Sequence, residues 1–532
     1  MPFLLRNLLL NLGEGEELLA KKLCDRLSLA RDRIAGFSVA RKGLDARHKG
    51  RIRFVYAIEF SVTDEEEFRQ THLPDPDIDH LEERRRPEFA RCSTSQRVLI
   101  AGMGPAGLFA ALRLTAYGLT PTLIERGKPV DERVKDVRTF WGKGGLDPES
   151  NVQFGEGGAG TFSDGKLTTR LRDANIDYVL QELVRFGAPS DILFLAKPHI
   201  GTDRLRVVVT NIRHYLESCG VEIRFRTRLT DIVGNAGRVA GVVLNDRVEE
   251  PCDILVLAPG HSARDTYRML ESRSVRLDAK PFAVGVRVEH PQELINRIQY
   301  GMPAHSGLPP ADYALAWNNR RTGRSAYSFC MCPGGEVVAG SSERGGVVTN
   351  GMSAYRRNSP YANSALVVNV GKDDFGSGSP LAGMEFQRTL EQKAFAAGGG
   401  DYCAPAQNLL AFLGERRKAA LSSTYRPGVR EADLSQVLPG FVAEALREGL
   451  RHFDRKMRGF ITGEACLIGV ETRTSAPVRI VRGDDFQSVT LPGLYPAGEG
   501  AGYAGGIMSA ALDGIRVADA IANSLQGGSL RE

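Results

Sequence analysis

Three closely spaced glycines and one acid are the clearest candidates for chemistry in this 532-residue chain. Gly102, Gly104 and Gly107 lie in GMGPAG, which follows the apolar run RVLIA and opens an alanine- and leucine-rich segment. In a strand, turn and helix, the first glycine makes the turn, the second admits a pyrophosphate, and the third lets the helix pack closely on the strand. Glu125, at the end of the next apolar run, is placed to accept hydrogen bonds from a ribose. The pattern predicts dinucleotide binding, with the phosphates at the positive end of a helix.

A second glycine-rich turn lies about 400 residues further on, in LYPAGEGAGYAGGIMSAALDG. It carries an acid, Glu499, and precedes a helix expected to start near Ile507. A nicotinamide enzyme has no obvious need for such a turn. In a flavoprotein the acid can bind ribityl or pyrophosphate-side groups, and the helix N-terminus can stabilise negative charge that develops on the reduced isoalloxazine. The pair of turns therefore favours FAD as the cofactor.

The stretch GTFSDGKLT, residues 160–168, is similar to the phosphate-binding loop of an ATPase. Such a loop needs a hydroxyl directly after its lysine to hold Mg²⁺, and a buried strand before it. Here Leu167 follows Lys166, and the preceding ESNVQFGEGGA is polar and glycine-rich. We therefore reject ATP hydrolysis and look for another role for these glycines.

The elements that would position these residues are legible along the chain. Residues 4–12 and 51–62 have strand composition, and GEELLAKKLCDRLS between them has helical periodicity. RVLIAGMGPAGLFAALRLTAYGLTPTLIERG is a complete βαβ unit, and CDILVLAPG is typical of a buried strand that ends in glycine. The predicted fold class is α/β.

We expect a Rossmann-type FAD-binding domain interleaved with a mixed α+β substrate-capping domain, plus a small α+β N-terminal domain. The N-terminal domain is expected at residues 1–90 and the first part of the FAD-binding domain at 91–275. The capping domain is expected at 276–485, and the C-terminal return into the FAD-binding domain at 486–532.

Composition and residue spacing indicate the cellular compartment and bear on membrane spans and metal sites. Eight cysteines without framework spacing fit a reducing compartment, and the N-terminal run MPFLLRNLLLNL is too short for a signal peptide. No apolar run reaches the roughly 18 residues of a membrane span. These features predict a cytoplasmic protein. The nine histidines show no metal-ligand spacing, so no metal site is expected. Nothing in the sequence indicates the oligomeric state.

Longer motifs resemble known flavoproteins. VLIAGMGPAGLFAALRL, LVLAPGHSARDT and GLYPAGEGAGYAGGI together resemble the two-part FAD-binding domain of the glutathione-reductase-type flavoproteins. GEGGAGTFSDGKLTTR, SFCMCPGGEVVAGSSERGGVVTNGMS and GVETRTSAPVRI more closely resemble a bacterial family of FAD-dependent dehydrogenases, or NAD(P)- and FAD-dependent oxidoreductases, of largely unassigned function. This resemblance covers essentially the whole chain. One departure is Glu499, where many flavoproteins have Asp.

The resemblance implies where FAD is held and explains GTFSDGKLT as a segment laid over the cofactor. Because no second GxGxxG unit is present, it also implies that any NAD(P)H binds transiently, or that the substrate itself is the electron donor. The residues expected to contact the cofactor are Gly102, Gly104, Pro105, Ala106, Gly107, Glu125, Arg126, Gly157, Gly158, Ala159, Gly160, Ser163, Lys166, Ala258, Gly260, Gly498, Glu499, Gly505, Gly506 and Ile507.

Catalytic residues are harder to assign. Glu471 and Arg473 precede the return into the FAD-binding domain, where an arginine would clamp a substrate or form a structural ion pair. Tyr503, beside the second turn, would stack or donate a proton. Cys330 and Cys332 would be a redox pair or, as their spacing favours, buried structural thiols.

The sequence therefore predicts an FAD-dependent oxidoreductase that transfers two electrons, as hydride, between a small organic molecule and FAD. A flavin monooxygenase is a variant of this prediction. Two alternatives stay open: an FAD-dependent RNA-modifying enzyme that uses the basic run from Arg41 to Arg53, and a non-catalytic binding protein on a flavoprotein fold. The run is followed by acidic residues around 64–79, which favours a solvated, charge-balanced face over nucleic-acid binding.

Overall fold

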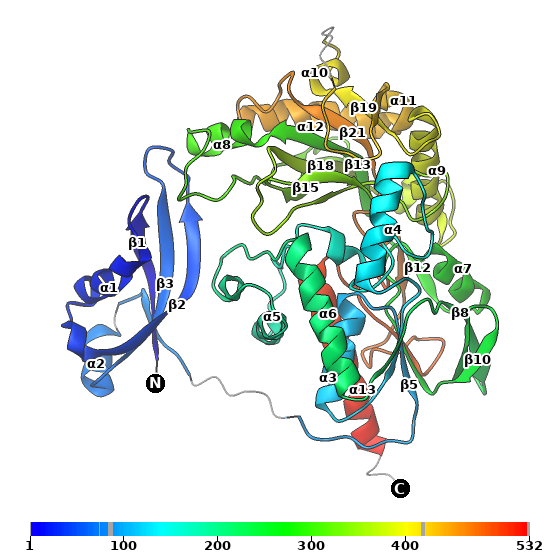
Figure 1. Ribbon diagram of the computed structural model, residues 1–532, viewed down its shortest axis with the longest axis horizontal. Helices are drawn as coiled ribbons and strands as arrows, with labels where there is room; N and C mark the ends of the chain where they lie inside the picture. Colours follow the sequence, from blue (N-terminus) through cyan, green and yellow to red (C-terminus); the bar gives the residue numbers. More distant parts are fainter. Residues whose placement is uncertain (1, 74, 83–88, 416–420, 529–532) are drawn as a thin grey trace.

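The structure is a computed structural model that describes residues 2–73, 75–82, 89–415 and 421–528. Its N-terminal part is a four-stranded antiparallel sheet with two helices on one face (Figure 1). The chain order and the sheet order β2-β3-β1-β4 make a ferredoxin-like arrangement. Its elements are β1 (Phe3–Asn11), α1 (Leu19–Leu27), β2 (Ile34–Asp45), β3 (Arg53–Val62), α2 (Glu65–His72) and β4 (Ile78–His80).

Edge strand β2 attaches this sheet to the rest of the molecule. The backbone N–H of Lys42 donates to Phe194 O at 2.7 Å, and Ala196 N–H donates to Lys42 O at 2.8 Å. Ile52, between β2 and β3, is buried in the core under the large antiparallel sheet described below. The small sheet is thus held to the main body by backbone hydrogen bonds and by apolar packing.

Charges in the basic run are partly balanced within the small sheet. Arg47 is paired with Asp45 at 2.8 Å, Arg53 approaches the same carboxylate at 3.7 Å, and Lys42 is paired with Glu16. Half of the run's six basic side chains therefore have a carboxylate partner on the same small sheet.

A five-stranded parallel sheet forms the next layer (Figure 1). Its central strand β5 is flanked by a strand that follows it closely in sequence and by one from about 150 residues later, and an edge strand arrives from the far C-terminus. This order explains why the two glycine-rich turns meet, because parallel strands place their carboxyl ends at one edge. In sheet order the strands are β23 (Leu494–Pro496), β11 (Ile254–Leu257), β5 (Val98–Ala101), β6 (Thr122–Ile124) and β7 (Glu222–Arg224).

Helices cover the parallel sheet, and two of them touch almost backbone to backbone. A Cβ at Gly514 of α13 would lie 2.1 Å from the carbonyl oxygen of Ala106 in α3, so glycine is required for this approach. A three-stranded antiparallel sheet shares a second core with the opposite face. The helices are α3 (Pro105–Ala116), α4 (Val130–Lys143), α5 (Ile176–Arg185), α6 (Thr202–Ser218), α7 (Arg264–Ser272) and α13 (Ile507–Gly528), and the strands are β8 (Leu229–Asn235), β9 (Arg238–Leu244) and β10 (Val248–Pro251).

A seven-stranded, mostly antiparallel sheet makes up the third part, above the parallel sheet in Figure 1. We call this sheet and its helices the cap. Its central strand β13 is buried along nearly its whole length. In sheet order the strands are β14 (Ala316–Asn318), β15 (Ser325–Cys332), β18 (Tyr361–Val370), β13 (Phe282–Pro291), β21 (Cys466–Glu471), β19 (Ala404–Asn408) and β20 (Val429–Glu431).

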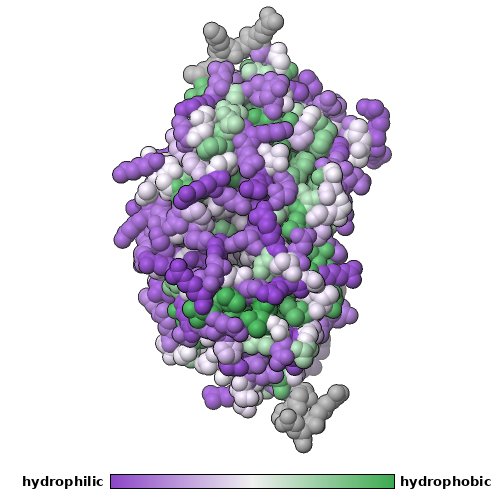
Figure 2. Space-filling view, turned by 90° about the vertical axis from the view of Figure 1, so that its right-hand side faces the viewer, coloured by the Kyte–Doolittle hydropathy of each residue, from purple (hydrophilic) through white to green (hydrophobic). Residues whose placement is uncertain are grey.

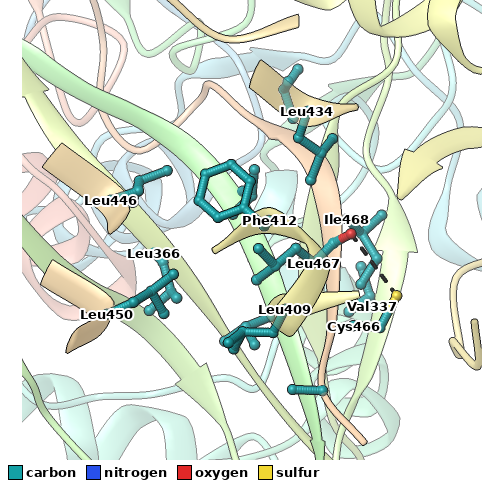
Figure 3. Close-up of a cluster of buried hydrophobic side chains, with 14 of the residues drawn as sticks. Val337, Leu366, Leu409, Phe412, Leu434, Leu446, Leu450, Cys466, Leu467 and Ile468 are labelled. Carbon is teal, nitrogen blue, oxygen red and sulfur yellow. Dashed lines mark hydrogen bonds between the residues drawn. The ribbon is translucent and has the colours of Figure 1, made fainter. Parts of the chain in front are cut away.

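Apolar helices close the outer face of the cap. Figure 3 shows Leu450 of α12 beside Leu366 of β18, and Leu446 of the same helix pointing toward Phe412. The cap helices are α8 (Gln292–Tyr300), α9 (Ala382–Ala397), α10 (Leu409–Phe412), α11 (Leu434–Val437) and α12 (Gly440–Lys456), and two small ribbons pair β16 (Glu336–Ala339) with β17 (Thr349–Met352) and β12 (Leu277–Ala279) with β22 (Val478–Ile480). The predicted α/β class, with a cap interleaved into a Rossmann-type layer, is confirmed.

The surface is mostly polar. Figure 2 shows one face, on which hydrophilic side chains dominate and hydrophobic ones gather in a strip across the lower half. Among the described residues, no helix combines the length and the apolar character that crossing a membrane requires.

Candidate functional site

A cavity of about 980 Å³ lies where the carboxyl edge of the parallel sheet faces the cap. Its walls include the turns after β5, β11 and β23 and the start of α13. The remaining wall includes cap residues of β15, β17 and β21. The cavity therefore joins all three glycine-ended strands to the cap.

The three glycines of the first turn differ in their surroundings. Gly102 has φ +109°, and a Cβ there would lie 2.1 Å from Ala258 O. A Cβ at Gly107 would lie 1.9 Å from Gly102 O, so this residue packs α3 on the strand and does not line the cavity. A Cβ at Gly104 meets nothing closer than Gly158 Cα at 3.9 Å. Gly104 thus presents open backbone to the cavity at the N-terminus of α3.

Glu125 is buried and ties the cofactor loops together. Its carboxylate accepts hydrogen bonds from the backbone N–H groups of Met103, Gly127 and Gly155, each at 2.9 Å. A carboxylate offers about four acceptor positions, so about one remains for a ligand hydroxyl. The sequence predicted only that Glu125 contacts the ligand. The structure shows that its carboxylate also holds the loops around the ligand site in place.

In the glycine-rich turn after β23, one glycine packs against the protein and two have free space where a side chain would lie. Gly498 has φ +76°, donates its N–H to Asp513 Oδ2 at 2.7 Å and packs against Ala106. No atom lies within 4 Å of a Cβ built on Gly505 or Gly506, just before α13. A helix N-terminus with bare backbone in front of it is suited to an electron-rich ligand.

Glu499 lines the cavity in the same turn. Burial raises its carboxyl pKa to about 7, and Lys280, on another wall of the cavity, offsets part of this effect. The Lys280 ammonium donates to Ser475 Oγ at 2.6 Å, and burial lowers its pKa. In the ligand-free protein, Glu499 therefore keeps its proton to a higher pH than an exposed glutamate does.

The glycine-rich segment forms a short 3₁₀ helix, η3 (Gly158–Phe162). Gly158, Ala159 and Gly160 line the cavity. Gly157 does not line the cavity, because it packs against Thr161: a Cβ built on Gly157 would lie 2.2 Å from Thr161 Oγ1. The segment therefore presents backbone to the cavity over only three residues.

Ser163 and Lys166 follow η3 and also line the cavity. Ser163 Oγ is used within its own turn, donating to Gly160 O at 2.7 Å. The Lys166 ammonium donates to Met331 O of β15 and lies 3.6 Å from the Asp164 carboxylate. Lys166 thus spans from the loop to the cap strand.

The catalytic candidates lie on the cavity wall, but protein partners already engage them. Glu471 is held by Arg287, with Nη2 to Oε1 at 2.8 Å and Nε to Oε2 at 3.0 Å. Arg473 donates to Glu391, which is also buried, at 3.0 and 3.1 Å. Both side chains are nearly inaccessible. These contacts match the structural ion pair that the sequence left open as the alternative to a substrate clamp.

Tyr503 is positioned by two arginines. Its hydroxyl accepts the backbone N–H of Arg482 at 3.1 Å, and the Arg482 guanidinium lies 3.8 Å from the ring centroid. Arg479 stacks more distantly, at 5.2 Å. The ring lines the cavity in a fixed orientation.

Cys330 and Cys332 line the cavity at an irregularity in β15, where Cys330 has φ +44°. Cys332 is buried, but Cys330 is exposed, so the prediction of buried thiols is correct for Cys332 only. Desolvation by the surrounding protein raises the pKa of both thiols, that of Cys330 to about 11. Lys166 acts in the opposite direction without cancelling the effect of desolvation. Both groups are neutral thiols at physiological pH.

His261 and Gln153 are two of the lining residues that sequence reasoning missed. The imidazole of His261 lies 2.8 Å from Ser262 Oγ, and burial together with Arg473 lowers its pKa to about 3. Gln153 is 7% exposed and donates its amide to Gly340 O at 3.0 Å, and its Oε1 is buried without a hydrogen-bond partner among the described residues. Only the position of His261 directly after Gly260 in LAPGHS signals its role in the sequence.

The cavity thus gathers most of the predicted site. Gly107, Gly157 and Gly498 pack behind its wall. In the described part of the chain, no group of three or more His, Cys, Asp and Glu side chains is arranged to hold a metal ion. The predicted residues that line the cavity are Gly102, Gly104, Pro105, Ala106, Glu125, Arg126, Gly158, Ala159, Gly160, Ser163, Lys166, Ala258, Gly260, Glu471, Arg473, Glu499, Tyr503, Gly505, Gly506 and Ile507.

Residues 281–474 match a family described as "FAD-dependent protein, C-terminal domain-like", and residues 5–61 match a domain of unknown function, DUF8436. Among solved structures, the flavin-dependent brominase Bmp2 is 14% identical, with a TM-score of 0.35 over 81% of this chain and 80% of that one. A geranylgeranyl bacteriochlorophyll reductase-like protein from Thermoplasma acidophilum is 13% identical, with a TM-score of 0.35 over 81% and 79%. Because the sequence identities and TM-scores are this low, neither structure supports an inference about the chemistry of this chain.

The open backbone at Gly104, Gly505 and Gly506, beside two helix N-termini, fits a dinucleotide such as FAD. An uncharacterised protein from Clostridium beijerinckii is 46% identical to this chain over 98% of both chains. This protein therefore belongs to the same family as that relative; its residues 281–474 match the C-terminal domain of FAD-dependent proteins, and its cofactor is FAD.

Proposed function

We propose that the protein is an oxidoreductase that moves two electrons, as hydride, between a small organic molecule and FAD. The observation that carries this proposal is the continuity of the cavity. The same space of about 980 Å³ touches the three glycine turns and the cap strands β15, β17 and β21. A cofactor held by the turns would therefore share its space with a molecule held by the cap.

We further propose a division of labour along the chain. Residues 91–275 and 486–532 hold FAD, residues 276–485 form the cap that admits and selects the substrate, and residues 1–90 are a separate unit. The pairing of half of the basic side chains in this unit with nearby carboxylates supports a small-molecule substrate over RNA.

The residues of the chain have distinct tasks in this proposal. FAD, when bound, supplies a two-electron acceptor. The amides at Gly104 and at the start of α13 bind its electron-rich groups, and Glu125 keeps the loops in place. Glu471 is paired with Arg287, and Arg473 is paired with Glu391. This part of the wall is therefore rigid and presents no net charge to the substrate. His261 is neutral, so it offers hydrogen bonds without repelling a cation or attracting an anion.

Lys166 supports an anionic substrate. The Asp164 carboxylate accepts two hydrogen bonds from Arg357, at 2.6 and 2.9 Å, so Lys166 shares the one carboxylate that it pairs with among the described residues with a second cation. The thiols of Cys330 and Cys332 are neutral and do not balance this charge. One positive charge in excess on the cavity wall favours a carboxylate or similar group on the substrate.

The test is anaerobic reduction of the FAD-loaded protein by a metabolite panel that includes organic acids, their amides, NADH and NADPH, followed by loss of flavin absorbance. Bleaching by at least one organic donor is expected, with acids more effective than their amides. A protein that cannot be loaded with FAD would refute the proposal. Bound FAD that no donor reduces would instead support the non-catalytic alternative.

A further inference from the structure

A second pocket, of about 200 Å³, lies outside the cofactor cavity. Residues of α4 and α6 form one side, and β16, β17 and residues 424–426 form the other. Phe162 of η3 also lines it, while residues 158–160 of the same short helix face the cofactor cavity. The pocket is therefore at the junction between the FAD-binding layer and the cap.

Three arginines from separate elements meet in this pocket: Arg138 of α4, Arg206 of α6 and Arg426. Within the described residues, the side chains of Arg138 and Arg426 have no hydrogen bond or ion pair, although both line the pocket. Arg206 makes only a long contact, 3.5 Å to Thr202 Oγ1. The backbone of Arg426 is held by a bridge to Val338 of β16, so its position does not depend on a side-chain partner.

The guanidinium of Arg206 lies in an energetically unfavourable environment. Its Nε is buried and has no acceptor. Burial lowers the pKa of the Arg206 guanidinium, the charge of Arg138 lowers it further, and Asp203 acts in the opposite direction. The Arg206 guanidinium carbon lies 5.0 Å from the centroid of the Phe162 ring, which also lines the pocket. Three guanidinium groups line this pocket, two without a side-chain partner among the described residues and the third with one long contact, and this indicates a missing acceptor that carries negative charge.

We propose that this pocket binds a phosphoryl group, either as inorganic phosphate or as a small phosphate monoester. The only carboxylate among its lining residues is Glu336, so three guanidinium groups leave an excess of two positive charges. A phosphate monoester carries about −1.5 to −2 at neutral pH and offers several acceptor oxygens to guanidinium forks. The small volume suits such a group and is below the roughly 300 Å³ of ordinary cofactor pockets.

An occupant would link two parts of the molecule. It would accept hydrogen bonds from α4 and α6 on the FAD-binding side and from Arg426 on the cap side. Because it would bind the folded arrangement only, its binding would also raise the melting temperature. This effect is independent of the substrate chemistry proposed above.

The test uses the FAD-loaded full chain in phosphate- and sulfate-free buffer, so that FAD already fills the pyrophosphate site. Inorganic phosphate and glycerol 3-phosphate are titrated by calorimetry, with succinate as a dianion of different shape and sodium chloride at matched ionic strength. Arg138→Ala and Arg426→Ala remove exposed side chains and leave Phe162 packing intact. Arg451→Ala, an exposed helical arginine in α12, removes the same charge elsewhere.

We expect one site per chain that prefers phosphate over succinate. Each of Arg138→Ala and Arg426→Ala should weaken it by roughly 10- to 100-fold, as loss of a charge-assisted hydrogen bond predicts, while Arg451→Ala should not. Tighter binding of one phosphate form identifies the source. No phosphate binding, or binding that both pocket variants leave unchanged, would overturn the proposal. Flavin content, measured in parallel, keeps this outcome separate from failure of the FAD site.

Discussion

Gly107→Ala is expected to destabilise the protein even without FAD. The added Cβ would lie 1.9 Å from the carbonyl oxygen of Gly102, and both groups belong to backbone. Relief requires α3 to move away from the end of β5 by about 1 Å. Overpacking of this kind costs about 1–3 kcal/mol, and a backbone obstacle puts the cost at the upper end. At roughly 2–4 °C per kcal/mol, the melting temperature of the FAD-binding part should fall by about 6–12 °C.

Gly104→Ala is the matched control from the same turn. Gly104 has φ −80° and ψ −177°, which alanine adopts easily, and its nearest neighbour would be 3.9 Å away. The stability of the FAD-free protein should be unchanged or slightly higher, because alanine restricts the unfolded chain. FAD affinity should fall, since the new methyl group enters the space in front of α3.

The assay has two parts: scanning calorimetry of the FAD-free proteins and titration of FAD by fluorescence quenching. The reasoning predicts that the two substitutions separate, one acting on stability and the other on affinity. The assignment of Gly107 to packing and of Gly104 to the cofactor space is refuted by either of two results. One is that FAD-free Gly107→Ala has the melting temperature of the wild type, and the other is that the melting temperature of FAD-free Gly104→Ala falls by several degrees.

Other predictions concern the cavity wall. Glu471→Gln leaves the Arg287 charge buried and unpaired, which should cost roughly 3–5 kcal/mol in denaturant unfolding; Arg287→Met with Glu471→Leu should recover most of it, and equal stability of single and double variants would contradict this. The Glu499 carboxyl ionises near pH 4.5 when unfolded and near pH 7 when folded, so the folded state holds an extra proton between these values. The stability of the FAD-free protein should therefore fall through this window as pH rises and level off above it, and Glu499→Gln should remove that component, measured as the difference between the two unfolding profiles. A double variant, Cys330→Ser with Cys332→Ser, should retain FAD and its reduction by an active donor, because both thiols are neutral; retained FAD with lost reduction would instead establish a redox pair.

The sequence predicted the parts of the fold that repeat a local pattern. The strand, turn and helix around Gly102 follow from spacing within about thirty residues, and so does the acid Glu125. In the N-terminal sheet, strands at 4–12 and 51–62 were expected and β1 and β3 are found at nearly the same places. The intervening strand β2, with its glycines and charges, gave no such pattern.

Long-range contacts explain what sequence reasoning missed. β13 is buried nearly throughout, so it lacks the alternation that marks a strand with one exposed face. The engagement of Arg473 by Glu391 joins residues 82 positions apart, and Lys166 meets Met331 across 165 positions. No local rule links such residues. The free acceptor on Gln153 depends in turn on where the backbone of Gly340 lies.

The split of the parallel sheet has a consequence for biosynthesis. β11 ends at residue 257, but its neighbour β23 begins only at residue 494. At about 5–20 residues per second, a ribosome needs roughly 10–50 s to make the intervening chain. Throughout that time the edge of β11 is an unpaired strand, open to association with other nascent chains. A polypeptide released just before residue 494 would carry the cap but lack β23 and α13, the strand and helix that complete the cofactor layer.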